Sequence, residues 1–166
     1  LIIFSYTLNL SYGQDYWQTQ SKLNYVKSNN IVNEDADNIQ IAKIDFDFFN
    51  KQIKNLKVPN SFNFTKKSIF FLNENQELEE FLIYKSNVLS ELISQKYPKI
   101  INFKGESQSR DGVKITGTFS PLGINGLIIT KETKVYIQPK KNSTNNQHIV
   151  YTKNRFSKSN HQRLNC

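Results

Sequence analysis

Apolar and polar residues alternate along several short stretches of this chain, a period typical of half-buried β-strands. In the first stretch the apolar positions are Ile39, Ile41, Ile44, Phe46 and Phe48, opposite Lys43, Asp45 and Asp47. The same alternation runs from Val113 to Phe119, before a Pro121-Leu122-Gly123 turn. Further strands are predicted at 67–72, 78–84, 100–103, 125–130, 134–138 and 148–152. The short turns between them predict a hairpin and a meander.

Two other stretches have helical spacing. Phe49, Ile53 and Leu56 predict a short helix that ends before Pro59. A second helix is expected after Ser86 or Asn87, either of which can cap it, and before Pro98. Its apolar stripe comprises Val88, Leu89, Leu92, Ile93 and Tyr97, which we expect to cover the sheet. The predicted fold is α+β and β-dominated: an antiparallel sheet or meander with one or two short helices packed on it.

The ends of the chain differ in composition from its middle. Residues 1–14 contain an apolar, uncharged run followed by small polar residues, which indicates the remnant of a secretory signal peptide. The run of roughly 10 residues is too short for a stable membrane helix, although a buried first strand is an alternative. We expect a loose polar lead-in at 15–38, one folded domain at 39–152 and a basic linker at 153–166. The expected location is extracellular, after periplasmic transit.

The net charge of +8 is spread thinly along the chain. Nucleic-acid binding requires clustered Lys and Arg that displace counterions from phosphates, whereas the lysines here are spread thinly from Lys22 to Lys158. The pattern therefore predicts no nucleic-acid partner. A basic domain can instead complement an acidic protein partner.

Residue types that carry catalysis are sparse. Asp45 and Asp47 share a strand face, but no nucleophile accompanies them, and the acidic cluster at 33–38 lacks the Gly and late Glu of a calcium-binding EF-hand loop. The histidines, His148 and His161, are too far apart for a His-Glu-x-x-His zinc motif. We expect His148 at a strand edge, His161 in the tail and no enzymatic activity in this segment.

Several motifs occur in the order found in one known family. They are the strand-to-helix passage 42–59 (AKIDFDFFNKQIKNLKVP), the stretch 81–127 with its Tyr-Pro and Pro-x-Gly turns, the strand 135–139 (VYIQP) and the strand 149–151 (IVY). Together they resemble the N-terminal prodomain of secreted bacterial reprolysin-like zinc metallopeptidases, over roughly residues 39–151. Departures from the family pattern include Val58 for Ala, Gln138 for Asp and the residues before the second helix.

The resemblance implies a propeptide that assists folding of a downstream metallopeptidase domain and keeps the zymogen latent. Its partner is its own catalytic domain, which would hold the zinc, and this segment needs no cofactor. Cleavage within the tail would end latency, and the predicted cleavage region contains Lys153, Arg155, Lys158 and Arg163.

The tail ends in the chain's single cysteine, Cys166. In a zymogen, its thiolate could occupy the open position on the catalytic zinc. A disulfide with a downstream cysteine is the alternative, because a secreted location permits one. Two other functions stay open: a secreted β-rich binding or adhesion domain without a protease partner, and a protease inhibitor that acts in trans.

Overall fold

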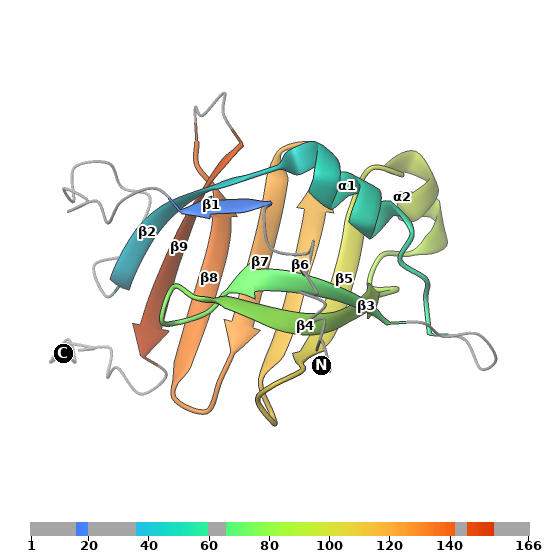
Figure 1. Cartoon of the computed structure of the whole chain (residues 1–166). Helices are drawn as coiled ribbons and strands as arrows, with labels where there is room; N and C mark the ends of the chain where they lie inside the picture. Colours follow the sequence, from blue (N-terminus) through green and yellow to red (C-terminus); the bar gives the residue numbers. More distant parts are fainter. Residues whose placement is uncertain (1–15, 20–35, 60–65, 142–145, 155–166) are drawn as a thin grey trace, which may run out of the picture.

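The computed structural model describes residues 16–19, 36–59, 66–141 and 146–154. Within these residues one antiparallel sheet has nine strands in the order β1-β2-β9-β8-β7-β6-β5-β4-β3 (Figure 1). The strands are β1 (Trp17–Thr19), β2 (Asp37–Ile44), β3 (Lys67–Leu72), β4 (Leu78–Lys85), β5 (Ile101–Ser107), β6 (Lys114–Ser120), β7 (Gly123–Ile129), β8 (Thr133–Pro139) and β9 (Gln147–Asn154). The helices are α1 (Phe46–Lys54) and α2 (Glu91–Lys96). The β-dominated α+β fold predicted from the sequence is confirmed.

Strands β3 to β9 follow one another across the sheet as a meander, and β1 and β2 extend it beside β9. The turn between β6 and β7 has the predicted chemistry, since Gly123 has a φ of +122° that glycine adopts without strain. The lead-in predicted at 15–38 includes β1, and its Tyr16 and Trp17 are buried.

The sheet is curved so strongly that its two edge strands approach each other. In Figure 1, β3 and β4 cross in front of β6 to β8. The indole Nε1 of Trp17 donates a hydrogen bond to the Phe70 carbonyl at 2.9 Å, and the Tyr16 hydroxyl donates to the same oxygen at 3.0 Å. The Phe70 N–H in turn donates to the Tyr16 hydroxyl oxygen. Tyr16, next to β1, and Trp17, in β1, thus satisfy the backbone N–H and carbonyl of Phe70 in the edge strand β3.

Two glycines let the strands pack tightly at the bend. A Cβ atom on Gly117 would lie 2.6 Å from the Phe103 ring, and one on Gly105 would lie 2.6 Å from Ile83. Phe103 pairs with Gly117 across β5 and β6, so its ring covers the backbone of the glycine. The close approach explains why these strand positions lack side chains.

Helix α1 fills the concave side of the sheet. Asp45 caps it, because its carboxylate accepts a hydrogen bond of 2.9 Å from the Phe48 N–H. Phe49 and Ile53 are fully buried, and the Phe49 ring contacts Phe71 and Phe119. The predicted core positions of this helix are confirmed. The strand predicted to continue through Phe48 is wrong, because the cap at Asp45 begins the helix there.

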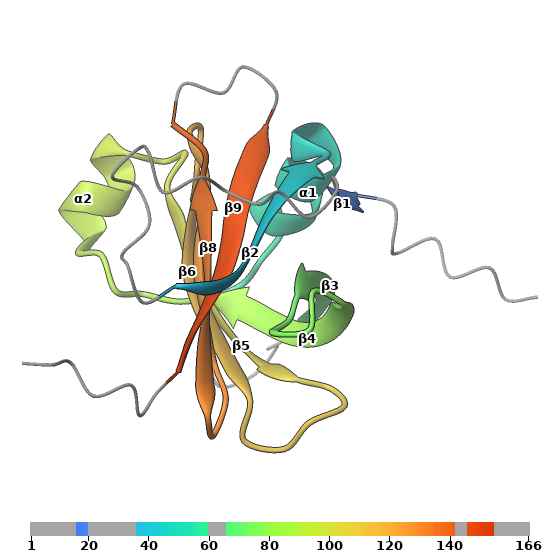
Figure 2. The ribbon, with the colours of Figure 1, turned by 90° about the vertical axis from the view of Figure 1, so that its left-hand side faces the viewer.

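Helix α2 does not cover the sheet with its apolar stripe as predicted. It begins only at Glu91, after Ser90, and Figure 2 shows it on the opposite side of β6, β8 and β9 from α1. Because β4 and β5 pair directly, the connection between them leaves and returns at the same end of the sheet. The concave side is already filled by α1, so the apolar stripe of α2 has no core surface to pack against.

We expect Tyr16→Phe to lower the free energy of unfolding by about 1–3 kcal/mol, because the edge N–H of Phe70 loses its acceptor inside the protein. Tyr97→Phe is the matched control, since Tyr97 is 48% exposed, and it should change stability by less than about 0.5 kcal/mol. Urea unfolding of both variants measures the difference. Equal stability of the two variants would show that the contact between the sheet edges contributes nothing.

Candidate functional site

The tail residues predicted from the sequence lie mostly outside the described part of the chain. Arg155, Lys158, Arg163 and Cys166 fall there, as do residues 1–14. Lys153 is described: it belongs to β9, pairs with Lys134, and its ammonium group lies 6.0 Å from the centre of the Tyr136 ring. A protease needs an unpaired extended chain, so cleavage after Lys153 requires β9 to separate locally from β8.

The described residues contain no group of three or more His, Cys, Asp or Glu side chains arranged to hold a metal ion. Asp45 and Asp47, which the sequence places on one strand face, instead form the cap and the first turn of α1. In the same parts of the chain no helix is both long and apolar enough to cross a membrane.

Apolar side chains gather on the surface around α2. We define the α2 surface as Val88, Leu92, Ile93 and Tyr97. Leu92 is 79% exposed and Val88 is 68% exposed, whereas Leu89 is half-buried. The ammonium group of Lys96 lies 5.5 Å from the centre of the Tyr97 ring. Several large apolar side chains on one short segment mark a surface suited to a protein partner.

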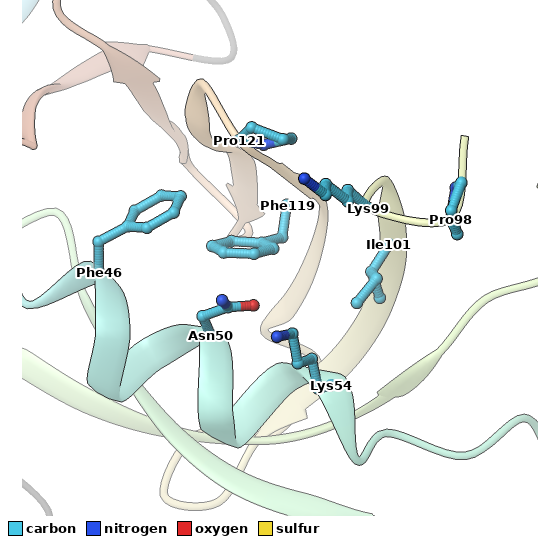
Figure 3. A pocket seen from close by; sticks show the side chains of 8 residues that line it. All are labelled: Phe46, Asn50, Lys54, Pro98, Lys99, Ile101, Phe119 and Pro121. Atoms are coloured by element: carbon cyan, nitrogen blue, oxygen red, sulfur yellow. The ribbon is translucent and has the colours of Figure 1, made fainter.

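A pocket of about 330 Å³ lies along α1, between this helix and the chain from Pro98 to Ile101. We call it the α1 pocket, and it is lined by Phe46, Asn50, Lys54, Pro98, Lys99, Ile101, Phe119 and Pro121 (Figure 3). Phe119 is buried and stacks on Phe46 with 4.9 Å between ring centres. Two exposed apolar residues are sequence neighbours of the lining, since Tyr97 precedes Pro98 and the 84% exposed Leu122 follows Pro121. The pocket and the α2 surface therefore adjoin along the chain.

The polar residues in the lining of the α1 pocket are Asn50, Lys54 and Lys99. Lys54 and Lys99 are exposed, Asn50 is half-buried, and the lining contains no acidic residue. Phe46, Asn50 and Lys54 follow one another at intervals of four along α1, a different stripe from the core positions Phe49 and Ile53. The spacing of these three residues is visible in the sequence, but only the tertiary structure places them in one pocket lining with Lys99.

His148 is buried, not at a strand edge as predicted. Strand β9 lies between β2 and β8, and only 1% of His148 is exposed. Its Nε2 accepts a hydrogen bond of 3.0 Å from the Ile124 N–H, and its Nδ1 lies 3.1 Å from the Asn146 carbonyl, so Nδ1 carries the proton. Burial lowers the pKa of His148 to about 4. The imidazole is a neutral packing element that holds the β6–β7 turn.

Arg110 joins the loop after β5 to two carboxylates. Its Nε donates to Glu79 at 2.8 Å, its Nη2 donates to Glu74 at 3.0 Å, and Ser107 donates to Glu79 at 2.5 Å. The Glu79 side chain is only 4% exposed. Hydrogen bonding by Arg110 lowers the pKa of Glu74, and both carboxylates raise the pKa of Arg110. Each charge has a partner, so neither carboxylate is left without a compensating cation in the fold.

No known protein family matches this chain, and neither curated proteins nor solved structures provide a similar sequence or fold. The resemblance to reprolysin-like prodomains stays a prediction from the sequence motifs. Within the described residues, the α2 surface and the adjoining α1 pocket form the best candidate site. Their chemistry suits binding of a partner.

The low pKa of His148 makes stability depend on pH. The unfolded imidazole has a pKa near 6.5 and the folded one near 4, so its contribution is present above pH 6.5 and is lost as the pH falls toward 4. We expect the wild type to lose about 3 kcal/mol more than His148→Gln between pH 7 and pH 4. Gln keeps an acceptor for Ile124 but does not titrate. Parallel pH dependences, measured by urea unfolding, would contradict a buried neutral His148.

Arg110→Ala should lower the free energy of unfolding by about 2 kcal/mol at pH 7, because Glu79 is left buried without its cation. The estimate is reduced for the partial exposure of Arg110. Arg110 also lowers the pKa of Glu74, so the part of the loss that comes from Glu74 is present above the unfolded pKa of Glu and disappears as the pH falls through the lower folded pKa. Lys66→Ala, which removes the exposed 3.7 Å pair with Glu106, is the control. Thermal unfolding that gives equal losses for both variants would refute the assignment.

Proposed function

We propose that this chain is the prodomain of a secreted zinc metallopeptidase precursor. In this role it docks on its own downstream catalytic domain, assists the folding of that domain and keeps the protease latent until the tail is cleaved. The zinc belongs to the catalytic domain, and the contribution of this segment is binding. The motifs between 39 and 151 supply the family expectation.

One observation supports a docking role above all. The α2 surface exposes large apolar side chains on and next to α2, which lies on the opposite side of β6, β8 and β9 from α1. Exposing such side chains to water is unfavourable by roughly 25 cal/mol per Å², and a partner domain that covers them recovers this free energy. A covalently attached domain is an efficient partner because the linker gives it a high effective concentration.

The remaining architecture suits a rigid docking scaffold. The core residues of the curved sheet and of α1 are buried, and the two sheet edges are joined through Tyr16 and Trp17. A scaffold of this kind presents α2 in one orientation without ordering a flexible loop on binding, which reduces the conformational entropy lost on association. Latency would then follow from occlusion of the protease cleft.

The coding sequence beyond Cys166 gives the first test. We expect a His-Glu-x-x-His motif followed by a third His within the next few hundred residues, because three imidazoles and a Glu build such a zinc site. Absence of that motif overturns the proposal and leaves the two alternatives, a secreted β-rich binding or adhesion domain and a protease inhibitor that acts in trans.

Inhibition in trans gives the second test. The purified chain should inhibit the separately produced catalytic domain in a peptidase assay, and the double variant Leu92→Ser with Ile93→Ser should inhibit about tenfold less, because central apolar contacts carry most of the binding energy. Gln95→Ser, an exposed polar change on the same helix, should inhibit like the wild type. An inactive wild type, or a fully active double variant, counts against docking through α2.

Cys166→Ala separates the two possible mechanisms of latency. Undiminished inhibition by this variant excludes a zinc-bound thiolate and leaves occlusion by the folded domain, whereas loss of inhibition assigns latency to Cys166.

A further inference from the structure

We infer that the α1 pocket binds a peptide segment that carries an apolar side chain next to a carboxylate. The apolar side chain would fill the pocket, and the carboxylate would lie between Lys54 and Lys99 at its mouth. Placing this segment on the catalytic domain rests on the proposed function, but the chemistry of the pocket does not.

The shape of the pocket suits a side chain. Its volume of about 330 Å³ is at the small end of ligand sites, which range over about 300–1,000 Å³. The buried ring of Phe119 forms its floor, with Phe46 on one side and Ile101 on the other (Figure 3). Aromatic rings at this depth offer edge and face contacts to a Phe or Leu side chain.

The positive charges of Lys54 and Lys99 favour a carboxylate next to the apolar side chain of the ligand. Lys54 comes from the last turn of α1 and Lys99 from the chain that follows α2, so two distant segments place cations around one opening. The ion pairs found among the described residues involve Lys66 and Arg110, not these two lysines. Asn50 adds an amide that can donate a hydrogen bond. The arrangement favours an anion over a cation or a neutral group.

The surroundings favour a polypeptide over a compact small molecule. Tyr97 and Leu122 are exposed next to the lining residues Pro98 and Pro121, so the apolar surface continues beyond the pocket. A peptide can cover these side chains on both sides of its anchor. A free phosphate would use only the lysines and leave the apolar floor uncovered.

Titration of the ¹⁵N-labelled full chain by NMR tests the inference. The probe is the peptide Gly-Ser-Phe-Glu-Glu-Ser-Gly, and the control peptides replace Phe by Ser or both Glu by Gln. We expect the probe to shift the amide signals of Lys54, Lys99 and Ile101, and each control to bind about tenfold more weakly. Shifts confined to other surfaces, equal binding of a control peptide or no shifts at all would overturn the inference. Equivalent shifts with inorganic phosphate alone would also overturn it, because the site would then be an anion site without apolar selectivity.

Charge reversal locates the binding site. The double variant Lys54→Glu with Lys99→Glu should bind the probe about tenfold more weakly, whereas Lys51→Glu, on the same helix but outside the pocket lining, should bind like the wild type. All three positions are exposed, so the fold should be retained, and circular dichroism checks this. Equal binding by the double variant and by Lys51→Glu would refute the assignment.

The inhibition assay separates this inference from the proposed function. If the Lys54 and Lys99 variant inhibits the protease normally while the Leu92 and Ile93 variant does not, the catalytic domain docks on α2 without using the pocket, and the inference fails alone. If the wild type fails to inhibit but still binds the probe peptide, the prodomain role fails and the pocket assignment stands.

Discussion

The meeting of the two sheet edges is the constraint on which the rest of this structure depends. A long antiparallel sheet leaves unpaired backbone groups along both outer strands. Here the Tyr16 hydroxyl and the Trp17 indole bond to the Phe70 backbone on the opposite edge. Burial raises the pKa of Tyr16 well above its ordinary value, so the hydroxyl keeps the proton that it donates. Few polar atoms thus hold the curvature that encloses the core.

The curvature decides what the two helices can do. A strongly bent sheet has one concave side, and α1 fills it with Phe49 and Ile53. Because α2 belongs to the connection between two paired strands, it remains at the end of the sheet and exposes Leu92. The same curvature brings the outer stripe of α1 opposite Lys99, which creates the α1 pocket. Core packing and the candidate binding surface therefore have one geometric cause.

The buried polar groups show how the fold tolerates residues that look functional in the sequence. His148 and Glu79 are both buried, and each finds its partners across neighbouring segments: His148 accepts from Ile124, and Glu79 accepts from Arg110. A buried polar group without a partner would be unfavourable by about 1–3 kcal/mol. Because their hydrogen bonds are made within the fold, we assign both residues a structural role. The candidate binding features are therefore the α2 surface and the α1 pocket.

Local patterns in the sequence determined strands β2 to β9, although not β1, because alternation with a period of two follows from the two faces of a sheet. They determined the class of fold, the core face of α1 and the Gly123 turn for the same local reasons. Only the tertiary structure decided which apolar stripe would be buried. Periodicity indicates that one face of a helix is apolar, but it does not indicate whether the fold provides an apolar surface against which that face can pack. The partners of Arg110 and the presence of both Lys54 and Lys99 in the lining of the α1 pocket likewise depend on contacts between distant segments, which no local pattern encodes.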